Sequence, residues 1–329
     1  MVNVSNHPSL PLLALAIPCY NEEEIISNSM RILNEHLTRW KQDKLIHEDS
    51  FFCYVDDGSN DRTWQLLAAE TGKHCHAIKL AHNVGHQNAL FAGMVYVADR
   101  SDCCISLDAD LQDDLSVIPE MLARYREGCE VVYGVRTDRS SDSWIKRSFA
   151  NSYYWLAAKI GIAGIPNHAD FRLLSRRALL IIREFREQHL YWRGIVPSLN
   201  LPSAKVFYKR QARVAGSSKY TIIKSLALAL NGLTSFSIVP LRFITLLGFV
   251  ISLISFYFIC SLIYNYYFDR TAVQGWTSLL VSLYFLGGLI MFSLGITGEY
   301  IGKIFIESKK RPLYIVEQQL DDTSPPPAA

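Results

Sequence analysis

The sequence lacks the glycine motifs that mark the commonest nucleotide sites. No G-x-G-x-x-G follows the first expected strand, and no G-x-x-x-x-G-K-[ST] occurs anywhere in the 329 residues. The first absence argues against a dinucleotide-binding Rossmann domain, and the second argues against a P-loop NTPase. A nucleotide-binding site in this chain must therefore be built from other residues.

Excess basic charge and paired cysteines are also lacking. Lysine and arginine (33) exceed aspartate and glutamate (31) by two, which argues against a nucleic-acid-binding surface. The seven cysteines include no C-x-x-C pair and suit a reducing compartment. The apolar run "LPLLALAIPCY" is short and follows no basic residue, so it is interpreted as a first strand and not as a targeting signal.

Two long stretches contain no charged residue. One lies between Arg242 and Asp269, and the other lies between Arg270 and Glu299. Each exceeds the roughly 20 residues with which a helix crosses a bilayer, so two transmembrane helices are expected at 243–266 and 275–298. Lysine and arginine flank the outer ends of both runs, which predicts that both termini are cytoplasmic. A pair of buried core helices is the alternative.

The part that precedes these runs alternates strand and helix patterns from residue 12 to about 135. Four or five strands joined by helices predict an α/β fold with a mostly parallel sheet and a binding site at the carboxyl ends of the strands. We therefore expect a catalytic domain over residues 1–215 and a two-helix membrane anchor over residues 241–302.

Two further segments complete the expected organisation. Residues 216–240 place lysines and apolar residues at helical spacing, which is typical of amphipathic helices in the headgroup region, although a core helix is the alternative. Residues 303–329 form a cytoplasmic tail, and its end, "LDDTSPPPAA", is expected to be disordered because it lacks packing residues.

The stretch "ISLDADLQDD" runs from an apolar strand into four acids, Asp108, Asp110, Asp113 and Asp114. Carboxylates this close raise one another's pKa unless a cation or a set of donors lies among them. Capping of the following helix explains Asp113 and Asp114. For Asp108 and Asp110 we expect a cation.

Nine motifs in order and spacing cover residues 12 to 314. They are "PCYNEE", "VDDGSNDRT", "HNVGHQNALFAG", "DADLQDD", "YGVR", "DFRLLSRRAL", "RVAGSSKY", "TSFSIVPLR" and "FLGGLIMFSLGITGEYIGKIF…RP". Together they resemble family 2 glycosyltransferases of the GT-A fold, specifically the polyprenyl-phosphate glycosyltransferases related to bactoprenol glucosyltransferase and dolichol-phosphate mannose synthase. The resemblance implies a GT-A catalytic domain with a Rossmann-like, mostly parallel sheet.

The resemblance also implies the donor side of the site. Asp108 and Asp110 of the D-x-D motif, with Gln112, are expected to hold Mg²⁺ or Mn²⁺ against the diphosphate of a UDP-sugar, because hard oxygen ligands suit a hard cation. The nucleotide-sugar-binding residues are then Pro18, Tyr20, Glu22, Asp56, Asp57, Asn83 and Asp108. For "DDGSND" a plain turn and helix cap is the alternative. His82 and His86 lie near the donor loop and are interpreted as hydrogen-bonding side chains rather than metal ligands.

The acceptor side is implied in the same way. A lipid phosphate already carries an anionic oxygen at neutral pH, so the protein is expected to supply cations rather than a base. The acceptor-phosphate ligands are Arg136, Arg147, Asn151, Arg213 and Lys219, although an exposed helix charge also explains Arg147. Asp170 stands where transferases that act on hydroxyls place their base, so either it acts chemically or it orients the sugar. The candidate catalytic residues are Asp108, Asp110, Asp170 and Arg213.

The resulting hypothesis is an inverting, metal-dependent glycosyltransferase that moves a hexose or N-acetylhexosamine from a UDP-sugar to undecaprenyl phosphate. It is expected in the cytoplasmic membrane as a multi-pass protein, in contact with membrane lipid, and relatives imply a homo-oligomer such as a tetramer. Residues His168 and Ala169 depart from the G-D-F-R-L pattern and leave the sugar open. Two alternatives are a processive polysaccharide synthase and a non-catalytic membrane scaffold. The synthases carry a Q-x-x-R-W motif, and the stretch "QHLYWRG" does not match it because its tryptophan precedes its arginine.

Overall fold

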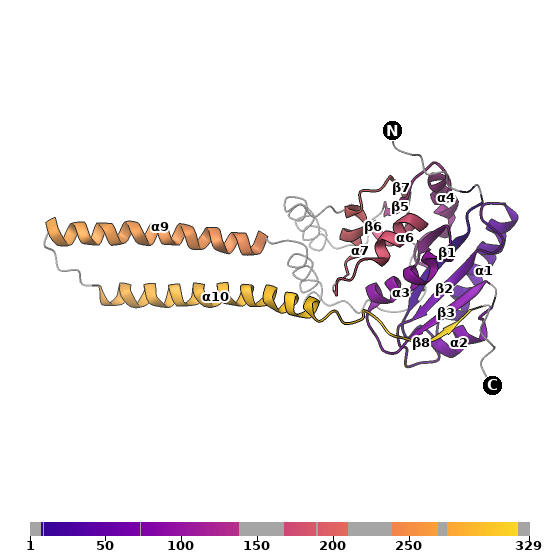
Figure 1. Ribbon diagram of the computed structural model, residues 1–329, viewed down its shortest axis with the longest axis horizontal. Coiled ribbons are helices and arrows are strands. Elements are labelled where there is room, and N and C mark those ends of the chain that lie inside the picture. Colours follow the sequence, from indigo (N-terminus) through magenta and orange to yellow (C-terminus); the bar gives the residue numbers. More distant parts are fainter. Residues whose placement is uncertain are drawn as a thin grey trace. The chain divides into compact units, whose positions relative to one another are not determined.

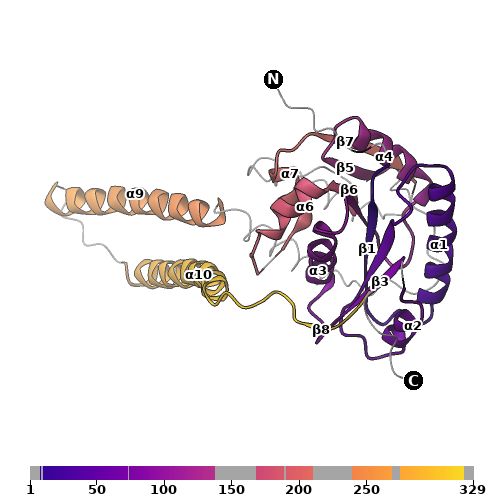
Figure 2. The same ribbon diagram turned by 45° about the vertical axis from the view of Figure 1, so that its right-hand side comes forward.

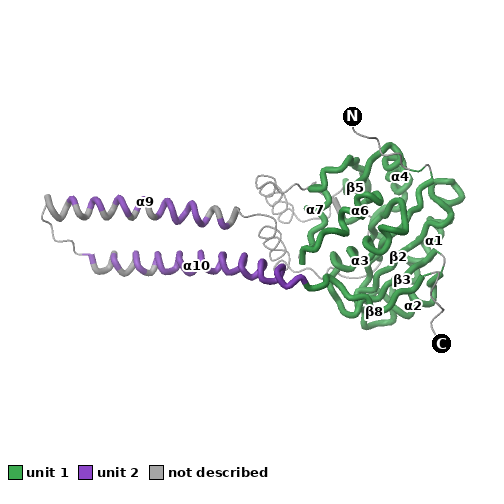
Figure 3. The backbone as a smooth tube through the Cα atoms, in the orientation of Figure 1, with its two compact units in different colours: residues 1–158, 163–220, 311–329 green, residues 159–162, 221–310 purple. Residues whose placement is uncertain are grey.

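The computed structural model describes residues 8, 10–72, 74–137, 168–188, 190–209, 239–268 and 275–321. The chain divides into two compact units. Unit 1 contains the sheet and includes the C-terminal residues from Arg311 onward, and unit 2 contains the two longest helices (Figure 3).

Unit 1 is built on one eight-stranded sheet with the order β7-β5-β6-β4-β1-β2-β3-β8. The strands are β1 (Leu13–Cys19), β2 (Phe51–Asp56), β3 (Cys75–Leu80), β4 (Cys103–Ser106), β5 (Val131–Arg136), β6 (His168–Ser175), β7 (Ser203–Tyr208) and β8 (Val316–Leu320). The four central strands β4-β1-β2-β3 are parallel, as are β5 and β7, whereas β6 runs antiparallel to both of its neighbours and β8 runs antiparallel to β3. The expectation of a mostly parallel sheet is confirmed.

The helices of unit 1 follow the pattern read from the sequence. They are α1 (Ile26–Gln42), α2 (Thr63–Ala69), α3 (His86–Ala98), the 3₁₀ turn η1 (Leu115–Val117), α4 (Ile118–Arg126), α6 (Arg176–Arg183) and α7 (Trp192–Ser198). Helices α1 and α3 lie on opposite faces of the sheet (Figures 1 and 2).

Strand β1 shows why both faces of the sheet are covered. Its seven residues are all buried, because successive side chains point to opposite faces and a helix layer packs on each. On the α3 side the close packing depends on Gly93 of α3, where an added Cβ would lie 3.0 Å from a methyl of Val55 and 3.3 Å from Ala16. The carboxyl ends of β1, β2 and β4 consequently meet at one edge, where the loops after them gather.

The segment predicted to be a cytoplasmic tail, residues 303–329, contains regular structure that the sequence did not predict. Residues 303–308 continue the last helix, and Val316–Leu320 form strand β8 at the edge of the sheet. Leu320, the first residue of the stretch expected to be disordered, pairs with Ala77 of β3. This strand was missed because "VEQQL" has no alternation of apolar and polar residues, and its partner β3 lies more than 230 positions earlier in the chain.

Unit 2 consists of α9 (Val239–Phe268) and α10 (Trp276–Ser308). Both charge-free runs therefore form helices as expected. Within the described residues, one helical stretch, Phe285–Ser308, has the length and apolar character needed to cross a membrane. The expected interfacial helices over 216–240 lie almost wholly outside the described residues, as do residues 322–329.

Candidate active site

The loops that follow β1 and β2 are joined by hydrogen bonds through their polar side chains. The backbone N–H of Asn21 donates to Ser59 Oγ (2.9 Å), and Asn21 Oδ1 accepts from the backbone N–H of Asn60 (2.9 Å). Asn21 has a left-handed backbone with φ of 53°, a conformation that asparagine tolerates better than most residues. The motifs "PCYNEE" and "VDDGSND" therefore build one surface at the carboxyl edge of the sheet.

Asp57 fixes the loop after β3 to this surface. Its two carboxylate oxygens accept from the backbone N–H groups of Val84 (2.7 Å) and Gly85 (3.0 Å). The next residue, Gly58, has φ of 66°, and a Cβ there would lie 2.7 Å from the backbone carbon of His82. Asp57 was predicted to bind the nucleotide, whereas the structure uses both of its oxygens to hold a loop.

Asp56 is arranged differently from Asp57. One oxygen, Oδ1, accepts from the backbone N–H of Ser59 (3.3 Å), while the buried Oδ2 has no hydrogen-bond partner among the residues that the structure describes. Burial raises the pKa of Asp56, which is what an acceptor without a donor produces. A hydroxyl or amide donor of a ligand would satisfy this oxygen.

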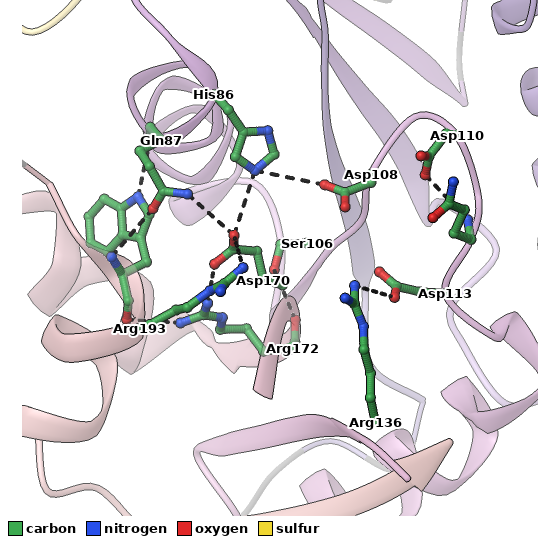
Figure 4. Close-up of polar contacts among 12 residues, drawn as sticks. His86, Gln87, Ser106, Asp108, Asp110, Asp113, Arg136, Asp170, Arg172 and Arg193 are labelled. Atoms are coloured by element: carbon green, nitrogen blue, oxygen red, sulfur yellow. Dashed lines mark hydrogen bonds and ion pairs between the residues drawn. The ribbon is translucent and has the colours of Figure 1, made fainter. Parts of the chain in front are cut away.

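Asp108 follows the end of β4 and faces His86 (Figure 4). Its Oδ1 lies 3.7 Å from Nε2 of His86, the first residue of α3. Partial shielding from water raises the pKa of Asp108 to about 6, the carboxylates of Asp113, Asp170 and Asp110 act in the same direction, and His86 opposes them. A carboxylate with this environment is stabilised by any cation that binds beside it.

Asp170 lies in a cage of donors. It sits on β6, and its side chain contacts Nη2 of Arg172 (2.6 Å), Nη2 of Arg193 (3.4 Å), Nε2 of Gln87 (3.3 Å) and Nε2 of His86 (3.8 Å). Burial alone would raise the pKa of Asp170, but Arg193, Arg172 and His86 together hold it well below its usual value. Asp170 is thus a permanently charged carboxylate at neutral pH.

The cage depends on strand geometry. Asp170 and Arg172 are two residues apart on β6, so their side chains point to the same face. Arg172 is fully buried, and its Nη1 donates to the carbonyl of Trp192 (3.0 Å), which ties β6 to the start of α7. The hydroxyl of Ser106, at the end of β4, donates to the carbonyl of Asp170 and joins the two strands.

Asp113 forms a second ion-paired group on the other side of Asp108 (Figure 4). Its Oδ1 accepts from Nη2 of Arg136 (3.2 Å) and from the hydroxyl of Tyr208, while Nε of Arg136 donates to that same hydroxyl (3.1 Å). The prediction that Asp113 caps the following helix is wrong, because the buried carboxylate is used in this triad. Asp114 does cap η1, accepting from the backbone N–H of Ser116 (2.9 Å).

The donor chemistry at Asp108 and Asp110 fits a hard divalent cation. Both are carboxylates in the loop that follows the carboxyl end of β4, and neither is fully buried. Gln112 is buried, and its Nε2 has no hydrogen-bond partner among the described residues. Across those residues no group of three or more His, Cys, Asp or Glu side chains forms a preassembled metal cluster, so ligand oxygens would have to complete the coordination sphere.

The remaining predicted donor-side residues lie in or beside the loops after β1 and β3, and most of the predicted acceptor ligands lie outside the described part. Pro18 is buried inside β1, Tyr20 and Asn83 are exposed in the loops, and the backbone N–H of Glu22 donates to Thr63 Oγ1 (2.9 Å). Four predicted acceptor ligands lie outside the described residues: Arg147, Asn151, Arg213 and Lys219.

Sequence reasoning missed Arg172, Arg193 and Gln87 as parts of the site. The alternation along "HADFRL" was an available signal, since it places Asp170 and Arg172 on one face. Arg193 lies in "QHLYWRG", and the mismatch of this stretch with the synthase motif gives no sign that Arg193 belongs to the site. Nothing in the local sequence connects Gln87 with a strand more than 80 residues away.

Comparisons with known proteins identify the family to which the chain belongs. The sequence model described as Glycosyl transferase family 2 matches residues 14–180. The uncharacterized glycosyltransferase YkoT of Bacillus subtilis is 48% identical over 95% of this chain and 93% of its own length. The bactoprenol glucosyl transferase of Shigella phage SfV is 36% identical over 93% of this chain and 98% of its own length.

The similarity to solved structures is weaker than the similarity to these two sequences. The mannosyltransferase PcManGT from Pyrobaculum calidifontis, solved in complex with GDP-Man and Mn²⁺, has a TM-score of 0.44 and 15% sequence identity, covering 66% of this chain and 61% of that chain. At this level of likeness nothing about donor or metal use follows for this chain.

Proposed function

The chain belongs to glycosyl transferase family 2, and we propose that it transfers a hexose or N-acetylhexosamine from a UDP-sugar to undecaprenyl phosphate at the cytoplasmic face of a membrane. The observation that carries this proposal is the similarity over 93% of the chain to bactoprenol glucosyl transferases, a share too large to be confined to the sheet of unit 1. A relative that shared only the sheet would support sugar transfer but not this acceptor.

On the donor side, the surface formed by Asn21, Asp56 and the loop after β3 would receive the nucleoside. The unpartnered Oδ2 of Asp56 supports this placement, because a ribose or base donor would satisfy it. Asp108 and Asp110 would hold Mg²⁺ or Mn²⁺, which neutralises negative charge on the leaving UDP when it is bound.

The transfer requires no general base. An oxygen of the lipid phosphate attacks the anomeric carbon, a new carbon–oxygen bond forms, and the bond to UDP breaks with its electron pair leaving on UDP. Because the phosphate monoester has a second pKa near 6, its oxygen is already anionic at neutral pH. Direct displacement inverts the anomeric configuration, so an α-linked donor gives a β-linked product.

Asp170 then has an orienting role. A carboxylate whose pKa is held far below neutrality is a poor proton acceptor but a strong hydrogen-bond acceptor. We infer that its free lone pairs bind hydroxyl groups of the transferred sugar, while Arg172 and Arg193 hold it in place. Arg136, Arg147, Asn151, Arg213 and Lys219 would bind phosphate groups, with Arg213 on the acceptor.

The membrane arrangement is part of the same proposal. Helix α10 contains the stretch that is long and apolar enough to span, and α9 carries Arg242 as its only charged residue over 30 positions. We infer that both helices span, that residues 216–240 lie at the interface, and that both termini are cytoplasmic. This topology would place the catalytic unit on the side where UDP-sugars occur.

The proposal is tested by UDP release. Purified protein is incubated with each of several UDP-sugars and Mg²⁺ or Mn²⁺, with and without undecaprenyl phosphate. We expect release with one or a few donors, only when the lipid phosphate and a divalent cation are both present. Release that does not depend on the lipid would contradict the proposed acceptor, and no release with any donor would contradict the proposed activity.

A further inference from the structure

The segment that follows α10 packs against the side of unit 1 that supports Asp170. Residues Arg311 to Asp321 belong to unit 1 and end in β8, which pairs with β3. Before β8 begins, the ring of Tyr314 meets the ring of Phe91 edge-on, with 6.1 Å between centroids and an interplanar angle of 77°. Phe91 is a buried residue of α3.

Phe91 carries the contact on to α7. Its ring stacks on the indole of Trp192, with centroids 5.4 Å apart and an interplanar angle of 27°. Trp192 is fully buried and leads α7. Aromatic pairs in these geometries are favourable beyond the area they bury, so the three rings Tyr314, Phe91 and Trp192 are expected to move as a group.

Trp192 in turn determines the position of Gln87. The indole Nε1 donates to the backbone carbonyl of Gln87 (3.1 Å), and the backbone N–H of Trp192 donates to Gln87 Oε1 (3.4 Å). With its oxygen used in this way, the amide of Gln87 turns its Nε2 toward Asp170 Oδ2 (3.3 Å; Figure 4). Arg193, which follows Trp192 in the chain, contacts the same Oδ2 of Asp170 (3.4 Å).

A second contact fixes the same piece of chain. Gln188 Nε2 donates to the backbone carbonyl of Arg311 (2.6 Å). Gln188 lies four residues before Trp192, and Arg311 lies three residues before Tyr314. The C-terminal segment therefore contacts Gln188 directly and Trp192 through Phe91. Arg193, next to Trp192, reaches Asp170.

We propose that Tyr314 is a positioning residue for Asp170, acting through Phe91, Trp192 and Gln87. Gln87 and Arg193 both contact Oδ2 of Asp170, and the aromatic group formed by Tyr314, Phe91 and Trp192 sets the positions of those two donors. The inference rests on the proposed function for its kinetic consequence, but its structural part can be measured without any substrate.

The kinetic test compares full-length Tyr314→Ala with Tyr314→Phe and with Ile315→Ala. Ile315 is 52% exposed, and only its backbone carbonyl is used, accepting from Ala81. We expect Tyr314→Ala to lower kcat roughly three- to tenfold with both KM values within about twofold, because a displaced orienting group acts at the transition state. Tyr314→Phe keeps the ring and should restore kcat, and Ile315→Ala should match wild type.

The structural test uses tryptophan emission in the absence of substrate. Tyr314→Ala should shift the emission of the protein, and the same substitution in a Trp192→Phe background should leave the emission unchanged, because the shift arises at Trp192. A melting temperature close to that of wild type shows that the fold is retained.

The outcomes separate this proposal from the proposed function. Equal kcat for Tyr314→Ala and Ile315→Ala in an active protein, or an emission shift that persists without Trp192, would overturn the positioning role. If no donor supports turnover, the emission experiment still decides whether the aromatic group is coupled to Tyr314. A kcat loss that Tyr314→Phe fails to restore would assign the effect to the hydroxyl and contradict the proposal.

Discussion

Nη2 of Arg172 lies 2.6 Å from Oδ1 of Asp170, and the two side chains leave the same face of β6. Arg172 is fully buried, so its charge has few other ways to be compensated. This pair organises the site, because Arg172 also holds the backbone of Trp192 and Asp170 gathers Arg193, Gln87 and His86.

We expect Arg172→Leu to destabilise the protein strongly. The substitution leaves Asp170 without its nearest countercharge, and breaking a buried ion pair costs about 3–5 kcal/mol. For a unit of this size the melting temperature should fall by roughly 6–12 °C or more. Arg193→Leu is the matched control, because Arg193 is 39% exposed and its pairing is weakened by solvent. Thermal denaturation measures both variants. Equal falls in melting temperature would contradict the conclusion that Arg172 is the main countercharge of Asp170.

The low pKa of Asp170 predicts a pH-dependent contribution to stability. A carboxylate whose pKa is depressed by folding stabilises the folded state above the unfolded value, which is about 3.9, and this contribution is lost as pH falls below it. The difference in melting temperature between wild type and Asp170→Asn should therefore narrow as the pH falls from about 5 toward 3. A difference that widens on acidification would contradict the direction of the shift.

Two cysteines of the sheet, the partly buried Cys75 and the buried Cys104, should be inert to thiol reagents in the folded protein. Burial raises the pKa of both Cys75 and Cys104 to about 12, so neither forms appreciable thiolate at pH 7–8. Labelling with an impermeant maleimide, counted by mass spectrometry, should leave both unmodified until the protein is unfolded. Rapid modification of Cys104 without loss of structure would show that β4 opens.

Introduced cysteines permit a test of topology in intact cells, with the wild-type protein as the measure of background labelling. A cysteine at Thr271, in the connector between the two charge-free runs, should react with an impermeant reagent applied outside, and a cysteine at Ser324 should react only after lysis. The exposed Cys260 lies within α9 and is expected to be shielded by lipid. Protection at 271 combined with labelling at 324 would overturn the proposed orientation.

Arg213 provides a test of the acceptor side. Its expected place between the sheet and the interfacial helices brings it near the surface from which a lipid phosphate arrives, and its planar guanidinium can bind two phosphate oxygens at once. Arg213→Lys should weaken apparent affinity for undecaprenyl phosphate by roughly ten- to a hundredfold, equivalent to losing about 1.5–3 kcal/mol, with little change for the UDP-sugar. Kinetics with each substrate varied in turn would contradict this role if only the UDP-sugar constant rose.

The parallel half of the fold was predictable because it is encoded locally. Buried runs such as Leu13–Cys19 and Phe51–Asp56 are continuous apolar stretches bounded by turn residues, and the helix between them, α1, has amphipathic periodicity. The antiparallel additions were not predictable in this way. Strand β8 pairs with a strand more than 230 positions earlier, and its own sequence, "VEQQL", carries no strand signal.

The candidate site divides along the same line. The acids Asp108 and Asp110 stand out in the sequence because like charges cluster after an apolar strand, whereas Asp170 was identified through the family resemblance. The partners of these acids do not stand out, since Arg172 reads as one of several arginines and Gln87 as a polar residue at a helix start. The loop-holding role of Asp57 could not be predicted, because a carboxylate that holds a loop and one that binds a ligand look the same in the sequence until the N–H groups of Val84 and Gly85 are located.

The most direct test of the central claim is the identity of the lipid product. Wild type, Asp110→Asn and the control Asp114→Asn are incubated with undecaprenyl phosphate, a divalent cation and the active UDP-sugar, and the lipid is analysed by mass spectrometry. Asp114 only caps η1, and asparagine caps equally well, so the control changes the same charge four residues away. We predict undecaprenyl phosphate carrying one sugar and a single phosphate from wild type and Asp114→Asn, and none from a correctly folded Asp110→Asn. A diphosphate-linked sugar, a polymer, or undiminished product from Asp110→Asn would contradict the account.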